Sequence, residues 1–214
     1  MPLYKIIKET NGLLTGIWQI SETEETFRQI LTPEDVSDAC ENYLSLKRRL
    51  ERYAVRALLF SMTQKHLKIC YHKDKSPYIQ SHEYNISISH TNGFAAIALH
   101  PCLKPGIDIE RPSPRVLNIK EHVFNQREIQ QMCSGSMAEQ EIYSTICWCA
   151  KETAFKVIGD NVYNYKQTLS IQPFIYKKKG KLLLKINQNN HISSLPVFYE
   201  VYPDFILTWS YVSQ

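Results

Sequence analysis

The chain has 214 residues, of which 43% are hydrophobic, and its formal net charge at pH 7 is +4. This apolar content is enough for a core in one large domain or two small ones, and the modest charge does not indicate nucleic-acid binding, although it suits an anionic small molecule or an acidic protein partner. No apolar stretch approaches the roughly 20 residues that span a bilayer, and residues 1–10 lack a signal-peptide core, so we expect a cytoplasmic protein that does not act at a membrane.

The first 63 residues begin with strand patterns and continue with helical ones. Residues 1–31 are rich in β-type patterns, with residues 13–20 the clearest strand. Residues 32–35, Thr-Pro-Glu-Asp, have the composition of a helix start, because Thr caps well, Pro fits the first position and acids favour the first turn. Apolar residues at helical spacing then predict a long helix over residues 45–63.

The predicted long helix carries a row of cations. Arg48, Arg52 and Arg56 are spaced four residues apart, so they share one stripe of the helix surface. Such a stripe is either a solvated helix face or, in a suitable context, a surface that binds anions.

A strand and a hairpin are predicted next. Residues 67–71 have the pattern of a strand, and residues 72–77 that of a turn. Residues 85–90 and 94–99 alternate on either side of a Thr-Asn-Gly turn, which predicts a hairpin. His90 is expected at the polar tip, where a lone histidine is either a solvated side chain or a functional group.

The segment 106–110, Gly-Ile-Asp-Ile-Glu, contains two acids on a predicted strand. Because side chains alternate along a strand, Asp108 and Glu110 project from one face. An isolated pair of this kind is ordinarily part of a half-solvated strand. Two close anions nevertheless favour a neutralising cation, and carboxylates with positions left for substrate phosphate suit magnesium better than zinc.

Residues 148–156 contain a second set of charged residues, on a helix predicted over residues 138–158. Trp148, Glu152 and Lys156 fall at i, i+4 and i+8, and we expect Lys151 beside them. Glu152 and Lys156 alone are also consistent with an ordinary exposed ion pair. Together with the acids at 108 and 110, this stripe predicts a site for a metal ion and a phosphate.

The C-terminal half mixes helices and strands. A single helix is predicted over 116–132, with Phe124, Ile129 and Met132 facing inward. The strands predicted after Gly159 cover residues 170–174, 181–186, 197–201 and 205–209. The helical segments 52–58 and 152–158 share a pattern, which indicates a weak internal duplication with a boundary near residues 101–105, and ligands often bind between such halves.

Three motifs in order resemble those of the Sfp-type 4′-phosphopantetheinyl transferases. Residues 87–90 resemble the S/N-x-S-H motif, residues 106–110 the G-x-D-x-E motif, and residues 148–156 the W-x-x-K-E-x-x-x-K motif. The resemblance covers most of the chain, but no motif maps onto the N-terminal strand or the tail after Lys156.

Three basic residues resemble positions with which family members hold coenzyme A. These are the spaced pair Arg48 and Arg56, and Lys75 before Pro77. Members often have Gly-Lys-Pro where this chain has Asp-Lys-Ser-Pro at 74–77, and a serine where Thr91 follows the histidine. Both departures fall on nucleotide contacts and not on the metal site.

The resemblance implies an α+β fold of two similar packed α/β halves related by a pseudo-twofold axis. Residues 1–103 would form the half on the nucleotide side of coenzyme A, and residues 104–214 the half with the metal site. It also implies an enzyme, a holo-[acyl-carrier-protein] synthase, which moves the phosphopantetheine arm of coenzyme A onto a serine of an apo acyl or peptidyl carrier protein and releases adenosine 3′,5′-bisphosphate. Two similar halves in one chain suggest a monomer.

The resemblance further assigns roles to individual residues. Asp108, Glu110 and Glu152 would hold Mg²⁺, and Glu152 is expected to take the serine proton directly or through a metal-bound water. The groups expected on the phosphates and nucleotide of coenzyme A are Arg48, Arg56, Lys75, Ser89, His90, Lys151 and Lys156. Two alternatives remain open, a non-catalytic coenzyme A or nucleotide-binding module of this fold, and a structural or interaction protein with ordinary surface charges.

Overall fold

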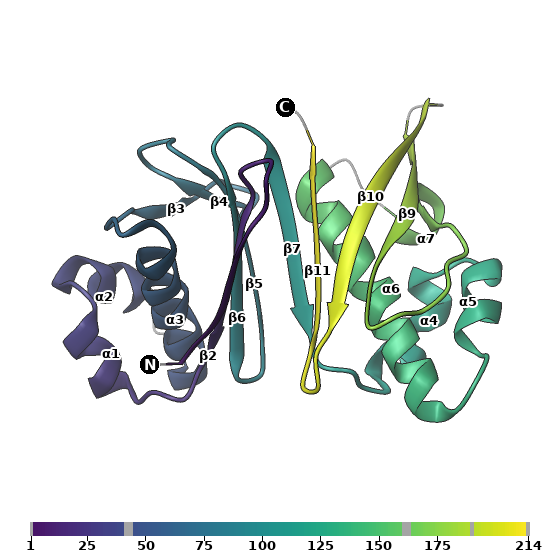
Figure 1. The fold of residues 1–214 in the computed structure, drawn as a ribbon, viewed down its shortest axis with the longest axis horizontal. Coiled ribbons are helices and arrows are strands. Elements are labelled where there is room, and N and C mark those ends of the chain that lie inside the picture. Colours follow the sequence, from purple (N-terminus) through teal and green to yellow (C-terminus); the bar gives the residue numbers. More distant parts are fainter. Residues whose placement is uncertain (1, 41–44, 160–163, 189–190, 213–214) are drawn as a thin grey trace. The chain divides into compact units, whose positions relative to one another are not determined.

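The computed structural model describes residues 2–40, 45–159, 164–188 and 191–212. The chain divides into two compact units, an N-terminal unit that ends at Pro105 and a C-terminal unit over Gly106–Val212 (Figure 1). Each unit has its own antiparallel sheet with helices packed against it, which confirms the predicted α+β class. None of the helices in the described residues is long and apolar enough to cross a membrane.

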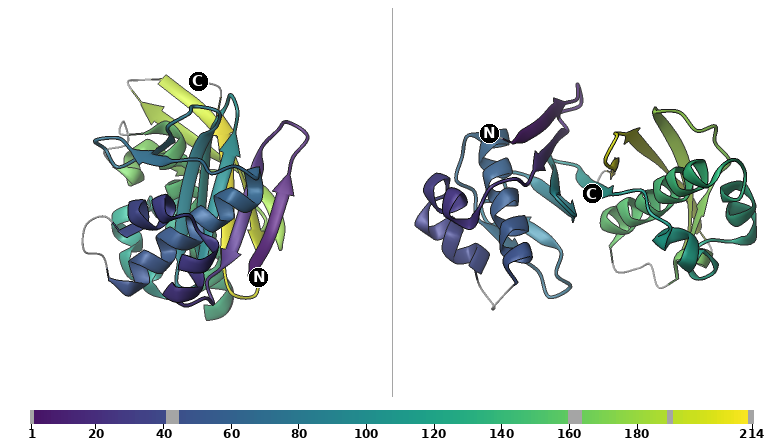
Figure 2. Two further views of the ribbon diagram at one scale, coloured as in Figure 1. Left: turned by 90° about the vertical axis from the view of Figure 1, so that its left-hand side faces the viewer. Right: turned by 90° about the horizontal axis from the view of Figure 1, so that it is seen from below.

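The N-terminal unit is built on a four-stranded antiparallel sheet with the order β1-β2-β6-β5. Its strands are β1 (Leu3–Lys8), β2 (Leu14–Gln19), β5 (Asn85–Thr91) and β6 (Phe94–His100), and its helices are α1 (Glu24–Ile30), α2 (Pro33–Cys40) and α3 (Leu46–Thr63). A separate two-stranded sheet pairs β3 (Ile69–Tyr71) with β4 (Pro77–Ile79). Helix α3 packs on β2 and β6, so it forms the second layer of this unit (Figure 2).

Local sequence signals explain where these helices begin. The side chain of Ser45 accepts a hydrogen bond from the backbone of Arg48 and caps α3, and Thr32 caps α2 through a 3.1 Å bond from the Asp35 backbone. Both starts match the prediction. Strands β1 and β2 lie in the segment 1–31 that was predicted to be rich in β structure, but the helix α1, which covers seven of its residues and buries Phe27, was not expected. A helix of two turns is too short to give a clear periodicity.

The predicted hairpin is confirmed as β5 and β6. Thr91 pairs with Phe94, so Asn92 and Gly93 form a two-residue turn, and Gly93 has the positive φ of 82° that such turns favour. His90 is the second-last residue of β5 and lies beside this turn. The register therefore places His90 at one end of the sheet.

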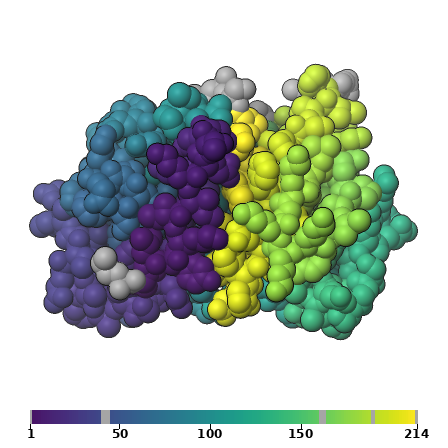
Figure 3. All heavy atoms as spheres, viewed as in Figure 1, coloured from purple at the N-terminus to yellow at the C-terminus, as the bar shows by residue number. Residues whose placement is uncertain are grey.

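The C-terminal unit contains a five-stranded antiparallel sheet with the order β7-β11-β10-β9-β8. Its strands are β7 (Lys104–Glu110), β8 (Leu169–Ile171), β9 (Lys179–Gln188), β10 (His191–Val201) and β11 (Ile206–Val212). Its helices are α4 (Arg115–Val123), α5 (Gln126–Met132), α6 (Met137–Ile158) and α7 (Tyr165–Thr168). Helix α6 packs against β9, β10 and β11, and one face of β9 remains exposed, as the yellow-green surface in Figure 3 shows.

Two features of this unit differ from the prediction. The single helix expected over 116–132 is two helices, because Asn125 caps α5 in a reciprocal arrangement with Glu128 and so begins a new helix. Phe124, Ile129 and Met132 are buried as expected. The short helix α7 was not expected, and Asn164 caps it with two backbone hydrogen bonds.

Candidate functional site

The candidate active site lies where β7 packs against α6 within the C-terminal unit. A Cβ atom on Gly106 would come within 2.5 Å of both the Thr153 carbonyl oxygen and the Val157 side chain on α6, so a glycine permits this close approach. Gly106 therefore faces α6, and strand alternation turns Asp108 and Glu110 toward the same side. The pair of acids predicted from the sequence is thus presented to the helix that carries Glu152.

Lys156 joins the strand to the helix. Its Nζ donates hydrogen bonds to Asp108 Oδ1 at 2.9 Å and to the Ile107 carbonyl oxygen at 2.8 Å. Asp108 is buried, whereas the Lys156 side chain keeps about a quarter of its surface exposed. A partly exposed ammonium group is therefore held at the edge of the site, next to the acid.

Glu152 experiences the charge of the other two acids. Burial, followed by the negative charge of Asp108, raises the pKa of Glu152, and Glu110 adds to the effect. The positive charge of Lys156 acts in the opposite direction. The three carboxylates therefore lie close enough to repel one another, and a cation among them would relieve that repulsion.

The predicted magnesium ligands are not a ready-made metal site. Across the residues that the structure describes, no group of three or more His, Cys, Asp and Glu side chains is arranged to hold a metal ion. In this arrangement the Lys156 ammonium lies against Asp108. The donor set nevertheless consists of carboxylate oxygens, which are the ligands Mg²⁺ prefers, so the residues fit that ion chemically.

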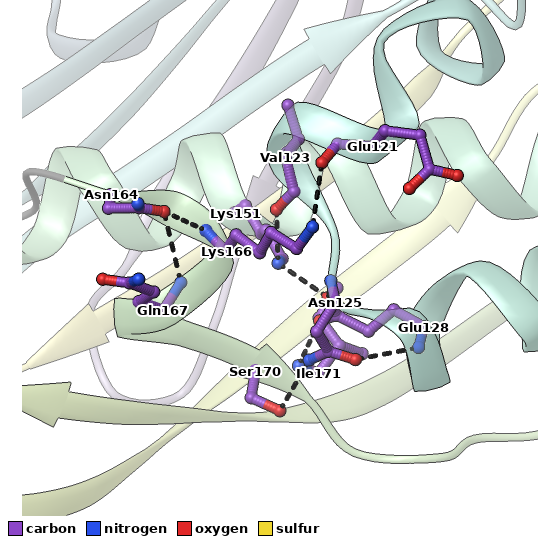
Figure 4. Close-up of polar contacts among 10 residues, drawn as sticks. All are labelled: Glu121, Val123, Asn125, Glu128, Lys151, Asn164, Lys166, Gln167, Ser170 and Ile171. Atoms are coloured by element: carbon purple, nitrogen blue, oxygen red, sulfur yellow. Dashed lines mark hydrogen bonds and ion pairs between the residues drawn. The ribbon is translucent and has the colours of Figure 1, made fainter.

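Lys151 does not lie on the stripe where it was expected. Its side chain is fully buried, and its Nζ donates to Glu128 Oε2 at 2.9 Å and to the Val123 carbonyl oxygen at 3.0 Å (Figure 4). The ammonium also lies 4.8 Å from the centre of the Phe124 ring. One residue along a helix corresponds to a rotation of about 100°, which turns Lys151 into the core while Glu152 reaches the site. A group enclosed in this way cannot contact a phosphate without leaving its ion pair.

Tyr165 is a site residue that the sequence reasoning missed. Its hydroxyl hydrogen-bonds with Glu152, and its ring packs near Trp148 and Phe155, with centroid distances of 6.3 and 5.8 Å. Burial and the neighbouring Glu152 raise the pKa of Tyr165, so the phenol stays protonated. A single tyrosine outside any motif gave no signal of this contact.

Four of the predicted coenzyme A contacts, Arg48, Arg56, Lys75 and His90, lie in the N-terminal unit around a pocket of about 820 Å³. Its cationic lining comes from α3, the β3–β4 hairpin and the end of β5, and consists of Arg48, Arg52, Arg56, Lys68, Lys75 and His90. Two acids, Asp38 and Glu51, also line it. The arginine stripe predicted from the sequence therefore faces a concave surface with a net positive charge.

Two further predicted contacts, Arg56 and Lys75, line the pocket, and Ser89 does not. Arg56 is only 5% exposed, and its Nη1 donates to the Arg52 carbonyl oxygen at 3.2 Å. Lys75 lines the pocket from a left-handed turn with a φ of 67°. Ser89 does not line this pocket, although it was expected at the nucleotide with His90, because strand alternation directs it to the other face of β5 from Ile88 and His90.

Comparison with known proteins supports one superfamily. Residues 104–200 match the family model of the 4′-phosphopantetheinyl transferase superfamily. The matched segment contains Asp108, Glu110, Glu152 and Lys156, and it covers nearly all of the C-terminal unit but not the N-terminal one. No curated protein matches the chain. The match supports a transferase of this superfamily and does not distinguish its subtypes.

Proposed function

We propose that the protein is an Sfp-type 4′-phosphopantetheinyl transferase, which moves the phosphopantetheine arm of coenzyme A onto a serine of an apo acyl or peptidyl carrier protein. The observation that carries the proposal is the gathering of Asp108, Glu152 and Lys156 at the contact of β7 with α6, inside the segment that matches the superfamily. A basic pocket in the other unit supports a nucleotide co-substrate.

The reaction is a phosphoryl transfer, in which placement and charge neutralisation carry most of the catalysis. The serine oxygen attacks the phosphorus atom that bears the pantetheine arm, and the bond between the two phosphates breaks. Adenosine 3′,5′-bisphosphate leaves with the bridging oxygen. Lys156 would move from Asp108 to the leaving phosphate and neutralise its growing charge.

Glu152 is the group proposed to accept the serine proton. Burial, followed by the charge of Asp108, raises its pKa in the absence of a bound cation, whereas a cation held by Glu152 would lower it. The hydrogen bond with Tyr165 would fix the orientation of its carboxylate. Protonation of Glu152 would also reduce the repulsion that it experiences from Asp108.

Asp108, Glu110 and Glu152 are the residues proposed to hold Mg²⁺, which is consistent with their all-oxygen donor set. When bound, the ion would neutralise and orient the diphosphate of coenzyme A. In the structure the Lys156 ammonium neutralises Asp108, and a bound cation would take over that part. Lys151 is not proposed to contact a phosphate of coenzyme A, because its ammonium is enclosed with Glu128.

The basic pocket is proposed to hold the nucleotide of coenzyme A. Arg48 and Arg56 suit its 3′-phosphate, because a guanidinium group binds phosphate through two parallel donors. Lys75 and His90 would add phosphate contacts from the hairpin and from β5. An acidic carrier surface would complement the net positive charge of the chain, and we propose a cytoplasmic monomer.

Mass spectrometry of a panel of apo carrier proteins tests the proposal. With coenzyme A and Mg²⁺, the wild-type protein should add about 340 Da to a carrier, the mass of the transferred arm. Asp108→Asn should abolish the shift, and Lys156→Met should slow it by at least about a hundredfold. Lys185→Met, at an exposed position on β9, is the matched control and should react like the wild type.

A non-catalytic coenzyme A-binding module is the second candidate, because the basic pocket does not depend on the acids of the other unit. Calorimetric binding of coenzyme A together with an unmodified carrier panel would favour that candidate. Carrier modification by the wild type, and its loss in Asp108→Asn, would exclude it.

A further inference from the structure

The basic pocket contains a buried carboxylate among its cations. Glu51 is only 4% exposed, and its Oε2 lies 2.8 Å from Arg48 Nη1 and 3.6 Å from His90 Nδ1. An acid at this place weakens the attraction of the pocket for an anion. Its presence in a phosphate-binding pocket therefore needs a reason other than direct attraction.

The two partners of Glu51 come from different elements of the N-terminal unit. Arg48 belongs to the first turn of α3, and His90 lies near the tip of the β5–β6 hairpin. Their side chains are 55% and 39% exposed, so each would sample several rotamers in the absence of a partner. Arg48 Nη1 also lies 3.2 Å from His90 Nε2, which brings the two cationic side chains together despite their like charge when His90 is protonated.

We infer that Glu51 is a positioning residue, whose buried carboxylate orders Arg48 and His90 for the nucleotide phosphate. The inference rests on the proposed function and deepens it, because it identifies what prepares the nucleotide side of the site. Prior ordering of two long side chains removes an entropic cost from binding. Because Glu51 acts through its two neighbours, it need not touch the ligand.

The sign of one binding change tests this inference. Adenosine 3′,5′-bisphosphate is titrated calorimetrically into the full chain and into Glu51→Gln, which keeps the size of the side chain and removes its charge. Positioning predicts about tenfold weaker binding by the variant. Electrostatic repulsion alone predicts tighter binding, so equal or tighter binding by Glu51→Gln overturns the inference.

Asp38→Asn is the matched charge control. Asp38 lines the same pocket and lies 3.9 Å from Lys68, whereas the charged partners of Glu51 are Arg48 and His90. Its replacement removes the same charge from the pocket, so binding should stay equal or become tighter. Equal weakening in Asp38→Asn and Glu51→Gln would mean that loss of any pocket acid weakens binding, and would overturn the specific role of Glu51.

A double-mutant cycle separates positioning from general damage to the fold. In a chain that already carries Arg48→Ala and His90→Ala, adding Glu51→Gln should change the affinity by less than twofold, because its targets are gone. A further tenfold loss in that background would overturn the inference. If Glu51→Gln does not fold, Glu51→Asp decides the question, since it keeps the charge and shortens the reach; unchanged or tighter binding by Glu51→Asp contradicts positioning.

The outcomes also separate this inference from the proposed function. A wild-type protein that binds no adenosine 3′,5′-bisphosphate overturns the nucleotide assignment of the pocket, and the role of Glu51 with it. Wild-type binding that Glu51→Gln does not weaken overturns only the role of Glu51 and leaves the proposed transferase in place.

Discussion

Both units pack a long helix onto an antiparallel sheet through a glycine, yet the two glycines face different surfaces. A Cβ atom on Gly16 of β2 would lie 2.5 Å from the Met62 sulfur on α3, at the end of a flexible side chain. A Cβ atom on Gly106 of β7 would lie 2.5 Å from the Thr153 carbonyl oxygen, which is backbone of α6. The α3 contact can adjust by moving a side chain, whereas the α6 contact can adjust only by moving the helix.

The ion pairs that hold the long helices of the two units differ in their exposure to solvent. In the N-terminal unit, Glu24 joins α1 to α3 through a 2.8 Å pair with Arg49 that remains partly exposed. In the C-terminal unit, the pair of Lys151 with Glu128 is fully enclosed. An enclosed ion pair therefore joins the long helix of the C-terminal unit to its neighbour, whereas the corresponding pair in the N-terminal unit is partly exposed.

The largest expected effect is on the enclosed ion pair. Lys151→Met leaves the Glu128 carboxylate buried without its cation and should lower the free energy of unfolding by about 4 kcal/mol. Urea denaturation measures this change. Lys166→Met is the control, because that lysine is exposed and donates to the Glu121 carbonyl oxygen at 3.1 Å, and it should cost less than about 1 kcal/mol. Equal effects of the two substitutions would contradict the stabilising role of the enclosed pair.

Gly106→Ala should have the next largest effect. The new methyl group meets the backbone of α6, and we expect a loss of about 3 kcal/mol in urea denaturation. Displacement of α6 would also separate Glu152 from Asp108, so carrier modification should fall by at least about a hundredfold under conditions where the variant is still folded. A stable and fully active variant would show that the close approach does not position the site.

Gly16→Ala should cost less than Gly106→Ala. The Met62 side chain can rotate away from the new methyl group, so we expect a loss of about 1 kcal/mol in the same denaturation experiment. The difference between the two glycine variants is the informative quantity. A larger loss in Gly16→Ala than in Gly106→Ala would reverse the comparison between the units.

The exposed ion pair should show the smallest effect, and one that depends on pH. Hydrogen bonds from Arg49 and then from Arg28 lower the pKa of Glu24 to about 2, from an ordinary value of 4.5. A lowered carboxyl pKa stabilises the folded state above pH 4.5, and this stabilisation is lost as the pH falls toward 2. Solvent exposure limits the contribution to about 1 kcal/mol. The stability difference between the wild type and Glu24→Gln should therefore shrink between pH 5 and pH 2, and a constant difference would contradict this origin.

Local patterns predicted the elements that depend on local physics. Alternation and turn residues indicated the hairpin at His90, apolar spacing indicated the long helix α3, and the stripe of Trp148, Glu152 and Lys156 indicated α6. The two-residue period of a strand predicted that Asp108 and Glu110 share a face, and the helical period predicted the same for Glu152 and Lys156. These features could be predicted because a strand or helix fixes which neighbouring side chains share a face.

Contacts between distant segments could not be predicted in this way. Lys151 is adjacent to Glu152 in the sequence, and only the packing of α6 decides which of them enters the core. Glu51 and Tyr165 belong to no motif, and their partners, His90 and Glu152, lie 39 and 13 residues away along the chain. The periodicity of one element contains no information about the element that packs against it.

A crystal grown with coenzyme A and Mn²⁺ tests the central claim most directly, since the anomalous signal of manganese locates the cation. We predict a peak bonded to oxygens of Asp108 and Glu152, with the Lys156 ammonium moved from Asp108 to a phosphate of the cofactor. Bound coenzyme A with no cation peak at these acids, and Lys156 still paired with Asp108, would contradict the account.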